Sequence, residues 1–174
     1  MMQLATIGYE GATVSDFLET LKSAGIETIV DVRELPLSRR KGFSKTALTA
    51  ALQTVGIGYH HLRALGDPKA GREAARAGRF VEFRKIFSKH IKTAAAQAAL
   101  REVLEIIESG EVCLLCYERE PNQCHRTMVA DALAEMSDIR VIHLGVRAGI
   151  SKHVRPNFRH GKLGGLGQGL TAAE

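Results

Sequence analysis

Short apolar runs alternate along this chain with segments that place apolar residues at helical spacing. Strands are predicted at 3–8, 27–33, 56–62, 111–118 and 139–145, and helical segments at 14–24, 44–55, 80–91, 93–108 and 124–136. Such alternation predicts a mainly parallel sheet with helices on both faces. We therefore predict a three-layer α/β fold with about five strands, because each run is the length of one strand.

The run at 111–118, EVCLLCYE, is continuously apolar, as is typical of a strand that is buried on both faces. Residues 63–79 show no clean periodicity and contain several glycines, so they are predicted to form a long loop. The domain prediction is one α/β domain over residues 1–147, followed by a basic, glycine-rich tail over 148–174.

The composition, 45% hydrophobic and 25% charged, is ordinary for a protein with one buried core. No apolar run approaches the roughly 20 residues that span a bilayer, and the N-terminus lacks the features of a secretory signal. Three cysteines are an odd number and do not suggest a disulfide framework. We expect reduced thiols, no membrane association and a cytoplasmic location.

Positive charge is concentrated in one part of the chain. The net charge is +5, but residues 31–92 alone contain 14 basic and five acidic residues. This asymmetry favours an anionic partner, either a phosphate-bearing small molecule or a nucleic acid, with a solvated basic surface as the alternative.

Polar and charged residues follow several of the predicted strands, where ligands bind in open α/β sheets. The candidate residues at this carboxyl edge are Tyr9, Glu10, Asp31, Arg33, Ser38, Arg39, His61, Glu118, Cys124, His125 and Arg126. We expect them to surround one ligand site, because right-handed crossovers place every strand-to-helix loop on the same edge.

The segment Cys124-His125-Arg126 is predicted to open a helix, where free N–H groups favour anions. Arg33, Arg39 and Arg126 are predicted to hold the anion, and Tyr9, Glu10, Asp31 and Ser38 to contribute to binding. Acid–base chemistry is assigned to His125 or His61 together with Glu118, and Cys124 is a candidate nucleophile. In the alternative, Cys124 packs inward while His125 and Arg126 support neighbouring loops.

Two cysteine patterns in the sequence resemble those of redox or metal sites. Cys113 and Cys116 should face opposite sides of a strand, which excludes a disulfide between them. Cys116, Cys124 and His125 have the side chains of a zinc site, but no fourth ligand lies at a recognisable spacing. The open alternative is that His60 or His61 supplies the fourth ligand across the sheet edge. The sequence therefore predicts no metal and no cofactor.

Four blocks in this order, TIGYEG, VDVRELPLSRRKGFSK, GIGYHHLRALGDP and LLCYEREPNQCHRTMVADAL, make the chain resemble the domain-of-unknown-function family DUF488 from about Thr6 to Leu133. The resemblance implies a bacterial or archaeal cytosolic α/β domain whose activity is not established. The family's motif residues carry over to Gly8, Tyr9, Glu10, Asp31, Arg33, Pro36, Ser38, Arg39, Gly42, Phe43, Ser44, Tyr59, His61, Leu65, Gly66, Glu118, Pro121, Cys124, His125 and Arg126.

Three functions remain open from the sequence. The first is an enzyme, a hydrolase or transferase, that binds a nucleotide or phosphate ester at the carboxyl edge. The second is a nucleic-acid-binding module without catalysis, suggested by the four basic residues around Phe43 in the segment 38–45. The third is a structural or protein-interaction domain in which the edge arginines only stabilise loops.

Overall fold

The computed structural model describes residues 1–153, so the part of the predicted tail at 154–174 lies outside the described residues. Five parallel strands form one sheet in the order β3-β2-β4-β1-β5. They are β1 (Met2–Gly8), β2 (Thr28–Asp31), β3 (Gly58–His61), β4 (Val112–Cys116) and β5 (Ile139–Leu144). The predicted α/β fold is confirmed, and every predicted strand is present.

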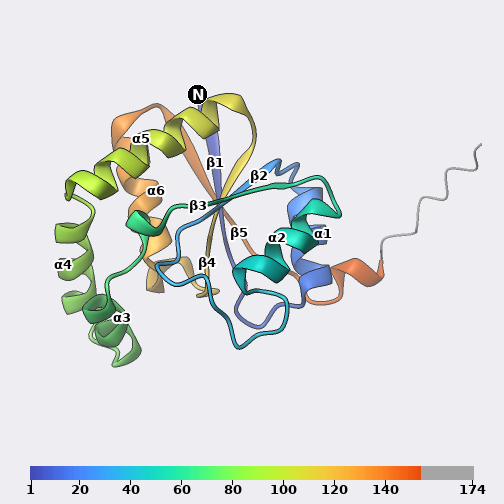
Figure 1. Cartoon of the computed structure of the whole chain (residues 1–174), viewed down its shortest axis with the longest axis horizontal. Coiled ribbons are helices and arrows are strands. Elements are labelled where there is room, and N and C mark those ends of the chain that lie inside the picture. Colours follow the sequence, from blue (N-terminus) through green and yellow to red (C-terminus); the bar gives the residue numbers. More distant parts are fainter. Residues whose placement is uncertain (154–174) are drawn as a thin grey trace, which may run out of the picture.

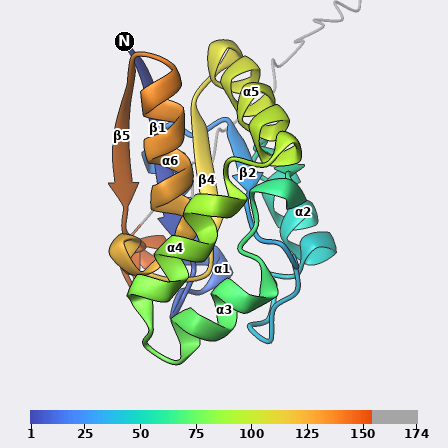
Figure 2. The same cartoon turned by 90° about the vertical axis from the view of Figure 1, so that its left-hand side faces the viewer.

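Helices cover both faces of the sheet (Figure 1). One face carries α1 (Val14–Ser23) and α2 (Lys45–Gln53). The opposite face carries α3 (Lys69–Arg76), α4 (Phe80–His90), α5 (Ala94–Ser109) and α6 (His125–Met136). Figure 2 shows this second layer from outside, with α3 near the end of the molecule toward which the strands run. No helix within residues 1–153 is long and apolar enough to cross a membrane.

The central strand β4 separates two apolar cores, and all five of its residues are buried. Cys113 and Leu115 pack with α1 and α2, whereas Leu114 and Cys116 pack with the helices of the other face. Side chains alternate between the two faces of a strand, so this division follows from the pleat. Cys113 and Cys116 therefore belong to different cores, as predicted.

After β3, the connections between strands change from one face of the sheet to the other. The connections from β1 to β2 and from β2 to β3 run over one face, and those from β3 to β4 and from β4 to β5 run over the other. In the sheet, β4 lies between β1 and β2. The loop that leaves β4 runs to one face, whereas the loops that leave β1 and β2 run to the other, so the loops diverge around the end of β4. This topological switch is where open α/β sheets form ligand crevices.

The predicted loop over 63–79 is wrong, because most of it is helical. A short 3-10 turn spans Arg63–Leu65, and α3 follows after Pro68. In the sequence, Gly71 argues against a helix, because glycine destabilises the interior of a helix. The structure explains it: a Cβ at position 71 would overlap the carboxylate of Asp67. Gly78, with φ +72°, follows the helix C-terminus, where glycine is favoured.

The chain after β5 is fastened to α1 through Asp16. The backbone N–H groups of Gly149 and Ser151 donate to its carboxylate over 2.9 and 3.0 Å, and the Ser151 hydroxyl donates over 2.6 Å. The first residues of the predicted tail thus pack on the domain as a 3-10 turn at Ile150–Lys152.

These hydrogen bonds, led by the Ser151 hydroxyl, lower the pKa of Asp16 well below its ordinary value. Folding then favours the ionised carboxylate, so its contribution to stability is complete above the unfolded pKa of about 3.9 and declines as the pH falls below it. We expect the melting temperature of wild type to exceed that of Asp16→Asn at neutral pH, with the gap narrowing below about pH 4. A gap in thermal melts that stays constant down to pH 3 would contradict this.

Candidate functional site

A cavity of about 1010 Å³ lies at the carboxyl edge of the sheet. Its walls come from the ends of β1 and β4, from the loop after β2, from α3 and α4, and from the start of α6. The lining residues are Tyr9, Arg33, Glu34, Leu35, Leu37, Ser38, Arg39, Arg40, Ser44, Asp67, Arg72, Ala75, Arg76, Phe80, Phe83, Cys116, Tyr117, Glu118, Gln123 and His125. The cavity therefore occupies the topological switch, where the loops diverge around β4.

Arginine dominates the charged lining of this cavity. Five arginines line it (Arg33, Arg39, Arg40, Arg72 and Arg76), against the acidic Glu34, Asp67 and Glu118. Arg72 pairs with Glu34, and the Arg40 side chain donates to the carbonyl of Ala12. Within residues 1–153, the side chains of Arg39 and Arg76 have neither an ion pair nor a hydrogen bond, so both guanidinium groups are available to an anion. Both residues are exposed.

Apolar side chains gather at the same place. Leu35, Leu37 and Tyr117 are 50%, 73% and 45% exposed, although large apolar residues are usually buried. All three line the cavity, together with Phe80 and the Tyr9 ring, which contacts Tyr117 edge-on at 5.3 Å between centroids. The cavity thus offers an apolar wall beside its arginines.

Asp31 and Arg33 form a buried ion pair at the end of β2. The Arg33 Nε and Nη2 atoms donate to the two carboxylate oxygens over 2.9 and 2.6 Å. Its Nη1 donates to the Tyr9 hydroxyl and to the carbonyl of Phe43, while the Tyr59 hydroxyl donates to Asp31 over 2.6 Å. Although burial opposes its charge, hydrogen bonds and the charge of Asp31 raise the pKa of Arg33 above its ordinary value. This ion pair holds the loop after β2 in place.

Arg126 is wholly buried and lies outside the cavity lining. Its Nε donates to the Thr6 hydroxyl over 3.2 Å, and its two terminal nitrogens donate to the carbonyls of Glu118 and Arg119. Gly8 makes this arrangement feasible, because a Cβ there would overlap the Glu118 carbonyl. Arg126 thus fastens the loop after β4 to β1, which is the loop-supporting alternative considered for it.

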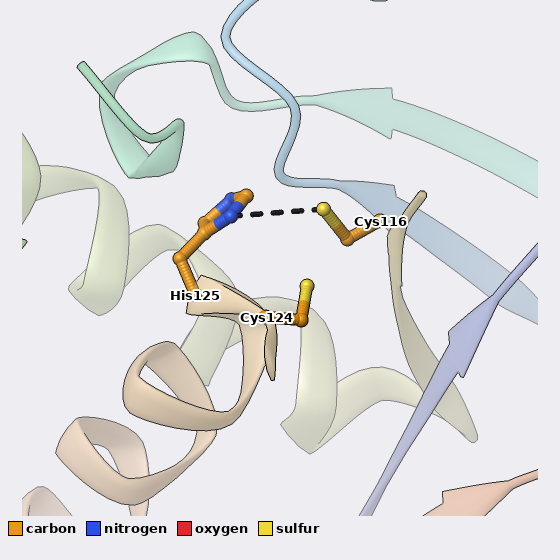
Figure 3. Close-up of side chains that lie close together, drawn as sticks. All are labelled: Cys116, Cys124 and His125. Atoms are coloured by element: carbon orange, nitrogen blue, oxygen red, sulfur yellow. Dashed lines mark hydrogen bonds between the residues drawn. The ribbon is translucent and has the colours of Figure 1, made fainter. Parts of the chain in front are cut away.

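Cys116, Cys124 and His125 converge at the cavity, which Cys116 and His125 line (Figure 3). Cys116 ends β4, Cys124 is the N-cap of α6, and His125 is the first residue of that helix. The Cys116 Sγ lies 3.6 Å from the His125 Nδ1 and 3.2 Å from a carboxylate oxygen of Glu118. The other ring nitrogen of His125, Nε2, donates to the carbonyl of Val32 over 2.7 Å, which leaves Nδ1 facing the Cys116 thiol.

Burial governs the titration of groups around the cavity floor. It raises the pKa of the Cys116 thiol and raises that of Cys124 further still. Neither thiol is therefore ionised at neutral pH in the metal-free protein, which disfavours a thiolate nucleophile. Burial also raises the pKa of Asp67 to about 6, and one of its carboxylate oxygens has no hydrogen-bond partner. The Asp67 carboxyl group can therefore gain or lose a proton near neutral pH.

Among the comparisons with known proteins, only the comparison with family models gives a match. The family model described as Domain of unknown function DUF488 matches residues 13–133, well over half of the chain. The chain belongs to the DUF488 family. No curated protein and no solved structure gives a match.

The structure of this DUF488 protein brings together about half of the predicted site residues. Tyr9, Arg33, Ser38, Arg39, Glu118 and His125 line the cavity, whereas Glu10, Asp31, His61, Cys124 and Arg126 do not. Glu10 accepts from the backbone N–H of Arg119, and His61 hydrogen-bonds the carbonyl of Arg33, so both brace the loops around the site.

Sequence reasoning missed the residues that α3 contributes. Asp67, which precedes α3, and Arg72 and Arg76 within it belong to the stretch 63–79 that is predicted to form a long loop. A signal was present: two basic residues four positions apart, Arg72 and Arg76, would share one face of any helix formed there. In this DUF488 protein that face meets the cavity.

Proposed function

We propose that this DUF488 protein binds a phosphate-bearing ligand, a nucleotide or phosphate ester, in the cavity at the carboxyl edge and acts on it as a hydrolase or transferase. The observation that carries the proposal is the pair Arg39 and Arg76. They approach one cavity from two different elements without partners of their own within residues 1–153. Guanidinium groups bind phosphate oxygens through paired, charge-assisted hydrogen bonds.

The other walls favour a ligand larger than inorganic phosphate. The volume of about 1010 Å³ is at the upper end for small-molecule sites. Leu35, Leu37, Tyr117 and Phe80 provide apolar contacts for a base or another organic group. A nucleotide or an organic phosphate ester combines both requirements.

Proton transfer in this proposal falls to Glu118 and Asp67, both of which line the cavity. Glu118 is half-buried, and Asp67 titrates near neutrality because burial raises its pKa to about 6. A general acid or base works best when its pKa lies near the working pH.

The three free cysteines are all buried, which supports a reducing, cytoplasmic setting.

Ligand binding is tested by melting the protein with pyrophosphate, nucleotides, sugar phosphates and short oligonucleotides, and by calorimetry on any ligand that raises the melting temperature. A ligand at about 100 times its Kd should stabilise the protein by about 2.7 kcal/mol. Because each charge-assisted contact contributes about 1.5–3 kcal/mol, we expect the loss of two contacts in Arg39→Ala/Arg76→Ala to weaken binding by at least about 100-fold.

The matched control is Arg84→Ala/Arg101→Ala, which removes two exposed arginines from α4 and α5 that do not line the cavity. It should bind as wild type does. Equal loss in both double variants, or stabilisation by oligonucleotides alone with steep salt dependence, would overturn the proposal and favour a nucleic-acid-binding module.

A further inference from the structure

We infer that Cys116, Cys124 and His125 form a zinc site with three protein ligands and a fourth position open to the cavity. The inference goes beyond the proposed function, because it stands whether or not the cavity binds phosphate. Two cysteines and one histidine are a ligand set of catalytic zinc sites, which keep one position for water or substrate.

The spacing of the ligand atoms fits a tetrahedral ion. The two Sγ atoms and a ring nitrogen of His125 all lie within 4.8 Å of one another. In a tetrahedral site with Zn–S near 2.3 Å and Zn–N near 2.05 Å, sulfur and nitrogen are about 3.6 Å apart. The distance from the Cys116 Sγ to the His125 Nδ1 is 3.6 Å. Figure 3 shows the three side chains directed toward the same space.

The orientation of His125 is that of a metal ligand. Its Nε2 donates to the carbonyl of Val32 over 2.7 Å, so Nδ1 is the ring nitrogen that faces the two sulfurs. Zinc-bound histidines are ordinarily held in this way by a backbone carbonyl or a carboxylate on the other nitrogen. The ring also lies against Phe87, with centroids 5.2 Å apart, which restricts its rotation.

Charge and burial fit a soft divalent cation. All three ligands are buried, and the two thiols would release their protons to solvent as Zn²⁺ binds. Two thiolates and a neutral imidazole then balance the ion, which makes the buried centre electrically neutral. Thiolate and imidazole favour zinc over magnesium or calcium, which prefer oxygen ligands.

The open position is defined by which ligands reach the cavity. Cys116 and His125 line it, whereas Cys124 lies behind them. The carboxylate of Glu118, 3.2 Å from the Cys116 Sγ, lines the same cavity. A site of this kind therefore requires no fourth protein ligand.

The test loads reduced protein with Zn²⁺, removes free ion by gel filtration and measures zinc per chain by mass spectrometry. We expect one ion per wild-type chain and at least roughly tenfold less in Cys116→Ala and in Cys124→Ala. The matched control is Cys113→Ala, which removes the buried cysteine on the opposite face of β4 and should retain the ion. Arg39→Ala/Arg76→Ala should also retain it, which separates this test from that of the proposed function.

Titration of metal-free wild-type protein with Co²⁺ gives a second measurement that does not depend on the folding of variants. Cobalt bound by thiolates in a tetrahedral site should show charge-transfer and intense visible absorption, saturating at one equivalent. The inference is overturned if wild type retains no stoichiometric metal in either assay. It is also overturned if Cys113→Ala loses zinc as fully as Cys116→Ala, or if protein isolated without reductant contains a Cys116–Cys124 disulfide.

Discussion

Replacement of Arg33 by methionine is expected to lower the free energy of unfolding by about 3–5 kcal/mol, the range for breaking a buried ion pair. The Asp31 carboxylate has no exposed surface, and the Arg33 guanidinium supplies its three charged hydrogen bonds. Without the guanidinium, only the Tyr59 hydroxyl and the backbone N–H of residue 33 still donate to Asp31. Urea denaturation followed by circular dichroism measures the change.

The double variant Asp31→Asn/Arg33→Met is the control, because it removes the stranded charge together with its partner. We expect it to be more stable than Arg33→Met alone, since most of the loss arises from an unpaired buried carboxylate. An Arg33→Met protein within about 1 kcal/mol of wild type would contradict the structure, as this is the range of surface ion pairs.

Substitution of Arg126 by alanine is expected to remove at least about 3 kcal/mol of stability. Arg126 is the largest of the fully buried side chains in the described part of the chain. Its loss leaves a cavity between β1 and α6 and frees the carbonyls of Glu118 and Arg119 from their donors. Chemical denaturation provides the measurement. The folded fraction should still bind ligand, because Arg126 does not line the cavity.

His143 reports on Arg126 independently of stability. The Thr6 hydroxyl accepts from Arg126 and also forms a hydrogen bond of 2.7 Å with the His143 Nδ1. Partial burial, followed by the charge of Arg126, lowers the pKa of His143. In Arg126→Ala, nuclear magnetic resonance titration should show this pKa rising toward the ordinary value of about 6.5. An unchanged His143 titration would mean that the guanidinium lies elsewhere.

The strands and most helices could be predicted from the sequence because their signals are local. The run at 111–118 indicated a strand buried on both faces, and β4 is the central strand. The helix at 69–76 was not predicted, because the reason for its glycine is a tertiary contact. Gly71 is present because Asp67 packs against that position, and no local pattern shows that contact.

The site was only partly predictable for a related reason. The position of a residue after a strand places it at the carboxyl edge, but it does not show whether the side chain faces the ligand or the protein. Arg39 and Arg126 are both arginines at that edge, yet one is exposed at the cavity and the other is completely buried. Hydrogen-bond partners distant in sequence, such as Thr6 for Arg126, decide between these outcomes.

The strand order also constrains when the protein can fold during its synthesis. β1 and β2 are not neighbours; each pairs with β4, so that Leu4 and Thr28 both meet Val112. Until β4 has left the ribosome, the earlier strands have no central partner, and β2 can pair only with β3. Pairings between such distant segments close slowly, and unpaired strand edges are prone to aggregate. We therefore expect the nascent chain to keep the middle of its sheet open until Cys116 is available, and to depend on chaperones in that interval.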